Sequence, residues 1–249
     1  MTAHARYVLR LADSNLVLAQ RLGEWVGHAP ALEEDLGLAN LALDLIGQAR
    51  LLLAHAGALE GRGRGEDELA YLREESEYLN LTLVEQPNGD FGDTIVRQFL
   101  FDAWQLGLYE ALATSSDATL AAVAAKGRRE AAYHLRYSGG WLVRLGDGTA
   151  ESHARVERSL ARLWPFVNEL FDDDEIDRAV AAEGVGVLPS VLQGAWSARV
   201  DETLARATLA RPATVPFGWY GKQGRHSEHL GYLLAEMQSL RRAHPGASW

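Results

Sequence analysis

The stretch Glu33–His55, EEDLGLANLALDLIGQARLLLAH, decides the fold. It contains no proline, its apolar residues are too dense for an exposed helix, and its length allows about six helical turns. We therefore predict a helix that is buried in a bundle. One polar side chain, Gln48, interrupts its apolar seam. Because burying an amide without a partner costs roughly 1–3 kcal/mol, we expect Gln48 to face another polar group.

Hydrophobic periodicity predicts helices along the rest of the chain and no strands, so the expected fold class is all-α. No internal repeat of about 20–50 residues is present. We expect a single domain over residues 1–249, with a core bundle at about 4–145 and additional helices at about 151–243. Pro165 should kink or break the helix that contains it. The predicted helices cover residues 4–25, 33–55, 66–78, 94–114, 116–145, 151–170, 172–183, 189–210 and 227–242.

The composition excludes several functions. A formal net charge of −10 argues against nucleic-acid binding, which requires a basic face. The absence of cysteine excludes disulfides, thiolate metal sites, iron–sulfur clusters and cysteine nucleophiles. The N-terminal residues lack the apolar core of a signal peptide, and no window of about 18 apolar residues is found. We expect a soluble, cytoplasmic protein that does not enter a membrane.

Four of the predicted helices each carry one polar residue in an otherwise apolar or small-residue seam, namely Asn15, Gln48, Asp102 and His134. A single such residue is typical of a hydrogen-bonded core position. Four of them in four helices indicate the centre of a helical bundle that could hold a metal site. In di-iron carboxylate bundles the ligands are a glutamate from each of two helices and a Glu-x-x-His pair from each of the other two.

The di-iron template fails on this sequence. None of the eight histidines has an acidic residue three positions before it. Ala131 lies three positions before His134, and Leu45 lies three positions before Gln48. The di-iron template requires an acidic residue at both places. One carboxylate, one imidazole and two neutral amides carry too little charge for two divalent ions in a desolvated core. We therefore predict no catalytic, cofactor-binding or metal-binding residues in this chain. The alternative is a hydrogen-bonded network, in which Asp102 pairs with His134 and fixes the helix register.

Two weaker candidates lie near the C-terminus. His226 and His229, three residues apart at the start of a helix, offer a surface metal site, although a solvated cap or a partner contact is the simpler interpretation. Lys222 and Arg225 belong to a short basic, flexible segment that offers a phosphate contact, although a plain surface loop is again simpler. Sequence motifs for serine hydrolases and for the common nucleotide-binding loops are absent.

Five blocks carry a family resemblance: RLGEWVGHAPALEEDLGLANLALDLIGQAR (21–50), LVEQPNGDFGDTIVRQFLFDAW (83–104), EAAYHLRYSGGWLVRLGDGT (130–149), LFDDDEID (170–177) and GKQGRHSEHLGYLLAEMQ (221–238). They closely resemble the C subunits of ring-1,2-phenylacetyl-CoA epoxidases, and the likeness covers essentially the whole chain. The resemblance implies a ferritin-like four-helix bundle core with additional C-terminal helices. It also implies a structural subunit, which accompanies a related A subunit that holds the di-iron centre.

According to this resemblance, the complex includes a reductase and small accessory subunits. It uses oxygen and NADPH-derived electrons to epoxidise the ring of phenylacetyl-CoA in aerobic phenylacetate catabolism. The C subunit is regarded as having lost its metal site and holding no cofactor. Matching of the helix motifs places the degenerate ligand positions at Asn15, Leu45, Gln48, Asp102, Ala131 and His134.

Three functional hypotheses follow. The first is a non-catalytic subunit that supports the di-iron A subunit; a homodimer of the lone chain is also left open. The second is a di-iron oxygenase in its own right, with atypical ligands. The third is a contribution to a coenzyme A site through Lys222 or Arg225. Candidate anchors for a subunit interface, each more simply explained by core or chain-end packing, are Trp164, Trp196, Trp219 and Trp249.

Overall fold

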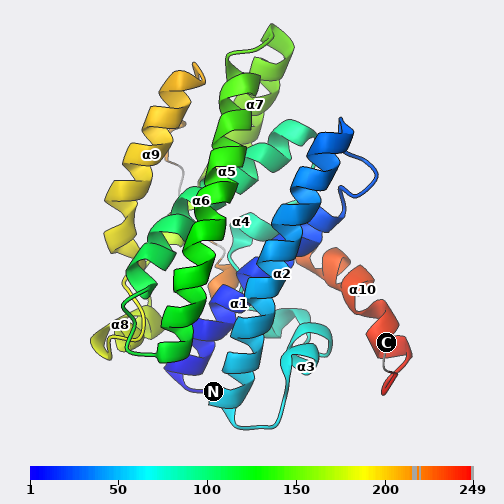
Figure 1. Ribbon diagram of the computed structural model, residues 1–249, viewed down its shortest axis with the longest axis vertical. Coiled ribbons are helices and arrows are strands. Elements are labelled where there is room, and N and C mark those ends of the chain that lie inside the picture. The colour runs from blue at the N-terminus through cyan, green and yellow to red at the C-terminus, as the bar shows by residue number, and fades with distance from the viewer. Residues whose placement is uncertain (215–217, 219, 248–249) are drawn as a thin grey trace. The chain divides into compact units, whose positions relative to one another are not determined.

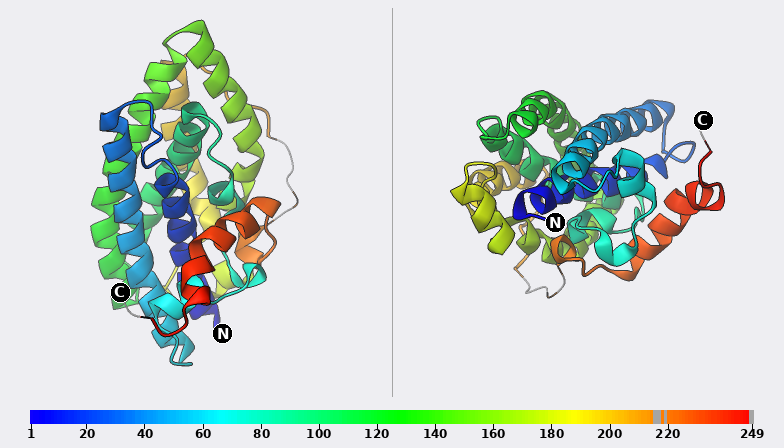
Figure 2. Two further views of the ribbon diagram at one scale, coloured as in Figure 1. Left: turned by 90° about the vertical axis from the view of Figure 1, so that its right-hand side faces the viewer. Right: turned by 90° about the horizontal axis from the view of Figure 1, so that it is seen from below.

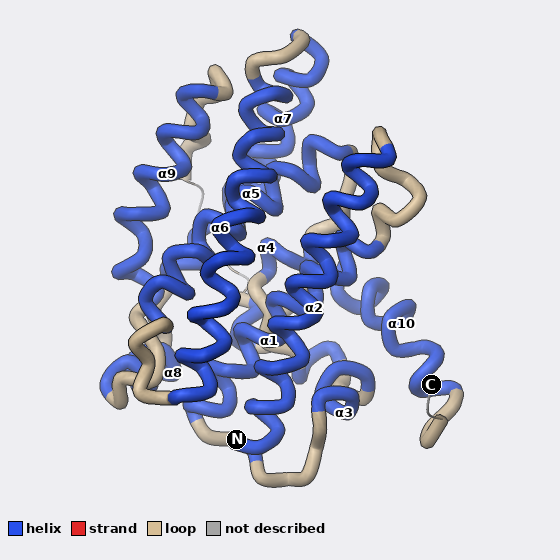
Figure 3. The backbone as a smooth tube through the Cα atoms, viewed as in Figure 1, coloured by secondary structure: helices blue, strands red, loops and turns tan. Residues whose placement is uncertain are grey.

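The computed structural model describes residues 1–214, 218 and 220–247. The chain divides into two compact units. The terminal unit contains residues 1–87 and the C-terminal segment from residue 220, and the middle unit contains residues 88–218. Helices dominate both units, and no strand occurs among the described residues (Figures 1 and 3). The all-α prediction is therefore confirmed, whereas the prediction of a single domain stays a prediction.

The terminal unit is built on two long helices that pack lengthwise, α1 (Ala3–Gly23) and α2 (Leu32–Glu60). In α1 most side chains are buried, and Thr2 caps its start by accepting a hydrogen bond from the Ala5 amide. The last helix contacts α1, α3, η1 and α4, and Figure 2 shows it beside the segment that holds these short helices. The remaining elements are α3 (Glu66–Tyr71), η1 (Glu75–Glu77), α4 (Thr82–Glu85), η4 (Gly221–Gln223) and α10 (Glu228–Ala243).

The middle unit is centred on a second pair of long helices, α5 (Phe91–Leu112) and α6 (Ala118–Gly146). Local sequence signals explain where its helices begin. Asp90 and Asp117 cap α5 and α6 through their carboxylates, and Asp174 does the same for α8. The remaining elements are α7 (Ala150–Leu163), η2 (Trp164–Phe171), α8 (Glu175–Ala182), η3 (Pro189–Leu192) and α9 (Gln193–Arg206).

Two predicted helices require correction. The helix expected over 66–78 ends at Tyr71, and the chain continues into the 3₁₀ turn η1. The helix expected over 151–170 changes from α to 3₁₀ geometry at Trp164, because Pro165 supplies no N–H for the α-helical ladder. The other predicted helices are found within a few residues of their expected bounds.

A cluster of aromatic side chains forms part of the core of the middle unit. Trp196 is 1% exposed, stacks obliquely on Trp164 and meets the edge of Phe171. Its indole N–H donates to the Leu100 carbonyl at 3.0 Å. Trp164 and Trp196 are therefore core residues, as the simpler interpretation held. Trp219 and Trp249 lie outside the described residues.

Candidate functional site

In the terminal unit, the polar residues of the α1 and α2 seams meet. Asn15 and Gln48 are each 2% exposed, and the Asn15 amide nitrogen donates to the Gln48 side-chain oxygen at 3.2 Å. This contact confirms that Gln48 faces a polar group. Two neutral amides offer a metal only weak carbonyl oxygens, so the pair is suited to fixing the register of α1 against α2 rather than to catalysis.

In the middle unit, Asp102 of α5 is fully buried. Its carboxyl accepts hydrogen bonds from the Ser138 hydroxyl of α6 at 2.7 Å and from the Gln98 amide at 2.6 Å. Burial raises the pKa of Asp102 to about 8, although both hydrogen bonds act in the opposite direction. At neutral pH this carboxyl is therefore largely protonated and uncharged.

The predicted pairing of Asp102 with His134 requires correction. His134 is fully buried on α6, but the carboxyl of Asp102 is taken up by Ser138 and Gln98. The Ser138 hydroxyl oxygen also lies 3.0 Å from the His134 carbonyl oxygen, one turn earlier on the same helix. Sequence spacing could not distinguish these partners, because a serine in a small-residue seam gives no signal of its role.

The side chains at all six degenerate ligand positions are buried. Asn15, Leu45 and Gln48 belong to the terminal unit, whereas Asp102, Ala131 and His134 belong to the middle unit. Only an aspartic acid and a histidine among them are of metal-ligand type. This donor set does not fit a di-iron centre, which needs several ionised carboxylates.

A buried ion pair that the sequence analysis missed links α1 to the segment after α3. Arg73 donates to the Asp13 carboxylate through both terminal guanidinium nitrogens, one of them at 2.9 Å, and the Leu79 amide donates to the same carboxylate at 2.8 Å. The guanidinium also lies 4.1 Å from the centre of the Tyr78 ring. Burial raises the pKa of Tyr78, so its hydroxyl stays protonated. The only sequence signal was an acid within the largely apolar first helix.

A second buried cluster fixes the start of α10. One oxygen of Glu85 accepts from the Ser227 amide at 2.6 Å, and the other accepts from Asn80 at 2.9 Å and lies 2.8 Å from His226 Nδ1. His226 Nε2 lies 2.8 Å from the Tyr78 carbonyl. Both ring nitrogens of His226 are thus engaged within the protein, which removes the predicted surface metal site with His229.

The basic segment near the C-terminus is not the flexible loop that was expected. Lys222 lies in η4 and is 4% exposed, and its carbonyl accepts from Arg10 at 3.0 Å. Arg225 is exposed and contacts the Gln223 side chain at 2.7 Å. Lys222 therefore does not present an ammonium group to solvent, whereas Arg225 does present a guanidinium.

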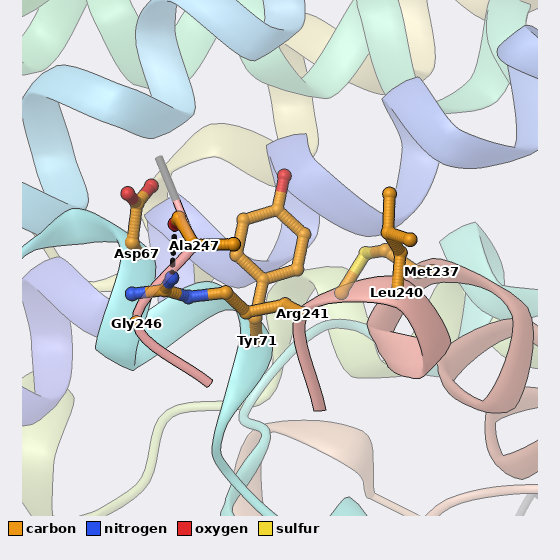
Figure 4. A pocket seen from close by; sticks show the side chains of 7 residues that line it. All are labelled: Asp67, Tyr71, Met237, Leu240, Arg241, Gly246 and Ala247. Atoms are coloured by element: carbon orange, nitrogen blue, oxygen red, sulfur yellow. Dashed lines mark hydrogen bonds between the residues drawn. The ribbon is translucent and has the colours of Figure 1, made fainter. Parts of the chain in front are cut away.

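The terminal unit also contains an open cleft of about 690 Å³ between α3, α10 and the residues after α10. Figure 4 shows its lining, in which the Arg241 guanidinium donates to the Ala247 carbonyl at 2.9 Å. Its walls mix the acidic Asp67 with Tyr71, Met237 and Leu240. None of the described residues that line it is a predicted site residue, and their charged groups form no arrangement suited to acid–base chemistry.

One helix of the described residues, α2, is long and apolar enough to cross a membrane. Helices in the cores of soluble proteins meet the same criteria. The packing of α2 along α1 and the hydrogen bond from Asn15 to Gln48 favour that interpretation.

The two pairs of long helices, with buried polar side chains in their apolar seams, define this chain as a helical-bundle protein. Residues 1–249 match the sequence model of the family described as phenylacetic acid catabolic protein, so the chain belongs to this family, which has a ferritin-like fold. The chain is 53% identical to the C subunit of 1,2-phenylacetyl-CoA epoxidase from Escherichia coli (strain K12) over 243 residues, which are 98% of each protein.

Proposed function

We propose that this chain is the non-catalytic structural subunit of a phenylacetyl-CoA 1,2-epoxidase complex in phenylacetate catabolism, and that it acts in the cytoplasm. The extent and level of its identity to the C subunit of such an epoxidase support the assignment to a complex of this kind. In this proposal the chain pairs with the di-iron A subunit, and reductase and small accessory subunits complete the assembly.

The donor set carries the non-catalytic part of the proposal. Leucine and alanine stand at positions 45 and 131, so Asp102 is the one carboxyl among the six degenerate positions. A di-iron centre needs anionic ligands to balance its charge, and these helices do not supply them. The chemistry of oxygen activation therefore belongs to the partner, and this chain contributes packing and position.

The test compares this chain alone with its complex. The chain is purified alone and after co-expression with the A subunit, and both samples are assayed for iron and for epoxidation of phenylacetyl-CoA. We expect about two irons per pair in the complex, as di-iron bundles hold, and neither iron nor turnover in the lone chain. About two irons per chain with turnover in the lone protein would overturn the proposal and favour the oxygenase alternative.

Asp102→Asn provides a matched variant for the same test. It keeps the shape of a neutral carboxyl and removes the single acid among the degenerate positions. If this chain has no metal role, the variant complex retains its iron and its turnover. A loss of iron in proportion to turnover would assign a ligand role to Asp102.

The contribution to coenzyme A binding stays a prediction that now concerns Arg225 alone. Its guanidinium is exposed, whereas Lys222 is buried. Arg225→Ala in the assembled complex should raise the KM for phenylacetyl-CoA without changing kcat if the guanidinium meets a phosphate. An unchanged KM would remove this contact.

A further inference from the structure

The helix α2 carries large apolar side chains on both of its faces. Its buried face packs within the terminal unit, yet four of its leucines are strongly exposed. Leu32 is 72% exposed, Leu36 57%, Leu43 64% and Leu51 48%. At about 100° per residue these four side chains fall within an arc of about 100° on the side opposite the buried seam, and the exposed Asn40 and Arg50 lie in the same arc. We call this exposed row of leucines the leucine stripe.

A solvent-facing helix normally presents charged and polar residues outward. The leucine stripe exposes about 400 Å² of leucine surface, a size at which an exposed apolar patch on a monomer is often functional. A standard protein interface buries about 800 Å² on each partner, of which somewhat more than half is apolar. The stripe thus supplies most of the apolar area that one side of such an interface needs.

Small residues favour another helix as the occupant. Gly47 and Ala54 lie on the same side of α2 as the leucine stripe, and nothing lies within 4 Å of the position that a Cβ on Gly47 would take. Small side chains between leucines allow the backbone of a second helix to approach closely. A membrane is a poorer fit, because α2 packs along α1 and carries the hydrogen-bonded Gln48.

Charge favours a different chain over a second copy. The first turn of α2 places Glu33, Glu34 and Asp35 beside the exposed Leu32 and Leu36. Two copies of a chain with a net charge of −10 repel each other. A partner helix with an apolar face and basic residues near this acidic turn complements the surface on both counts.

We propose that the leucine stripe is the docking surface for an apolar, basic-ended helix of the A subunit. This inference rests on the proposed function, because it takes the A subunit as the partner. The leucines then supply the buried centre of the interface, and the acidic first turn of α2 sets the direction in which the partner helix lies.

The test introduces charge into the stripe. Leu43→Glu and Leu51→Glu, which lie away from the acidic first turn, are made separately, and binding to the A subunit is measured by co-purification and by titration. We expect each variant to weaken binding by at least about tenfold, since burying a carboxylate without a partner is strongly unfavourable. Tyr232→Glu on α10 is the matched control, because Tyr232 is 72% exposed and lies outside the stripe; its binding should equal that of wild type.

Hydrogen–deuterium exchange on the wild-type complex provides a second measurement that does not depend on how the variants fold. Amides of residues 32–58 should become protected when the A subunit is added, while those of α10 keep their exchange rates. Wild-type binding by both stripe variants, or unchanged exchange in α2, would overturn the inference. The inference would also fail if the wild-type chain formed a dimer that the stripe variants dissociate while they still bind the A subunit. Flotation of the wild-type chain with phospholipid vesicles would overturn it as well. If the wild-type chain and the A subunit do not bind at all, the proposed function itself fails.

Discussion

The buried carboxyl of Asp102 makes the stability of this protein depend on pH. Its ordinary pKa is 3.8, and burial raises the pKa to about 8. Between these two values the folded chain holds a proton that the unfolded chain releases. The contribution of Asp102 to stability is therefore fully present below about pH 4 and is lost as pH rises through about pH 8.

Asp102→Asn tests this linkage. The free energy of unfolding of wild type, compared with that of the variant, should fall by up to about 1.4 kcal/mol per pH unit across this window and level off above about pH 8. Urea unfolding of both proteins from about pH 5 to about pH 9 measures the difference. A difference that stays constant up to about pH 8 would show that the carboxyl is ionised in the folded protein.

The contact between Asn15 and Gln48 is best measured by a double-mutant cycle. Asn15→Ala and Gln48→Ala each also create a cavity and remove other contacts, but the cycle isolates their coupling. We expect a coupling energy of about 0.5–1.5 kcal/mol, the usual value for a buried neutral hydrogen bond. Urea unfolding of the four proteins gives the value, and a coupling of zero would show that the amides act independently.

At the scale of elements, the ion pair between Asp13 and Arg73 joins α1 to the segment after α3. Asp13→Ala leaves a buried guanidinium without its carboxylate, which should cost about 3–5 kcal/mol of unfolding free energy. The surface pair of Arg211 and Asp201 is the control, because its side chains are 38% and 52% exposed. Asp201→Ala should change the melting temperature much less. Equal losses in the two variants would contradict the structural role of the buried pair.

At the scale of the whole molecule, the exposed apolar face of α2 and the net charge of −10 act together. The charge disfavours association of two copies of the chain, while the leucine stripe is available to a chain of complementary charge. Association with such a partner must then stabilise the folded chain, because the partner binds the folded state alone.

Addition of the A subunit should therefore raise the unfolding free energy of this chain. At a free concentration about 100 times the dissociation constant the gain is about 2.7 kcal/mol. Urea unfolding is measured with and without the A subunit, and hydrogen exchange at the amides of this chain reports its unfolding separately from that of the partner. Leu43→Glu should remove most of the gain and Tyr232→Glu none of it. A wild-type chain whose stability does not respond to the A subunit would contradict the pairing.

Much of the fold could be predicted because helix formation depends on neighbours only a few residues away. Asp117 and Asp174 cap their helices as the acidic residues near these starts indicated, and Pro165 ends regular α-helix where a missing N–H requires it. The end of α3 at Tyr71 was missed, because Arg73 turns back to Asp13 across about sixty residues of chain.

The sequence by itself determined that this protein is helical and that its helix seams contain few acidic residues, since both depend only on residue type and spacing. The tertiary structure decided which polar groups meet. It placed Asp102 against Ser138 rather than His134, buried Lys222, and left one apolar face of α2 in solvent. Periodicity shows which residues share a face of a helix. Whether that face is buried depends on packing between segments distant in the chain.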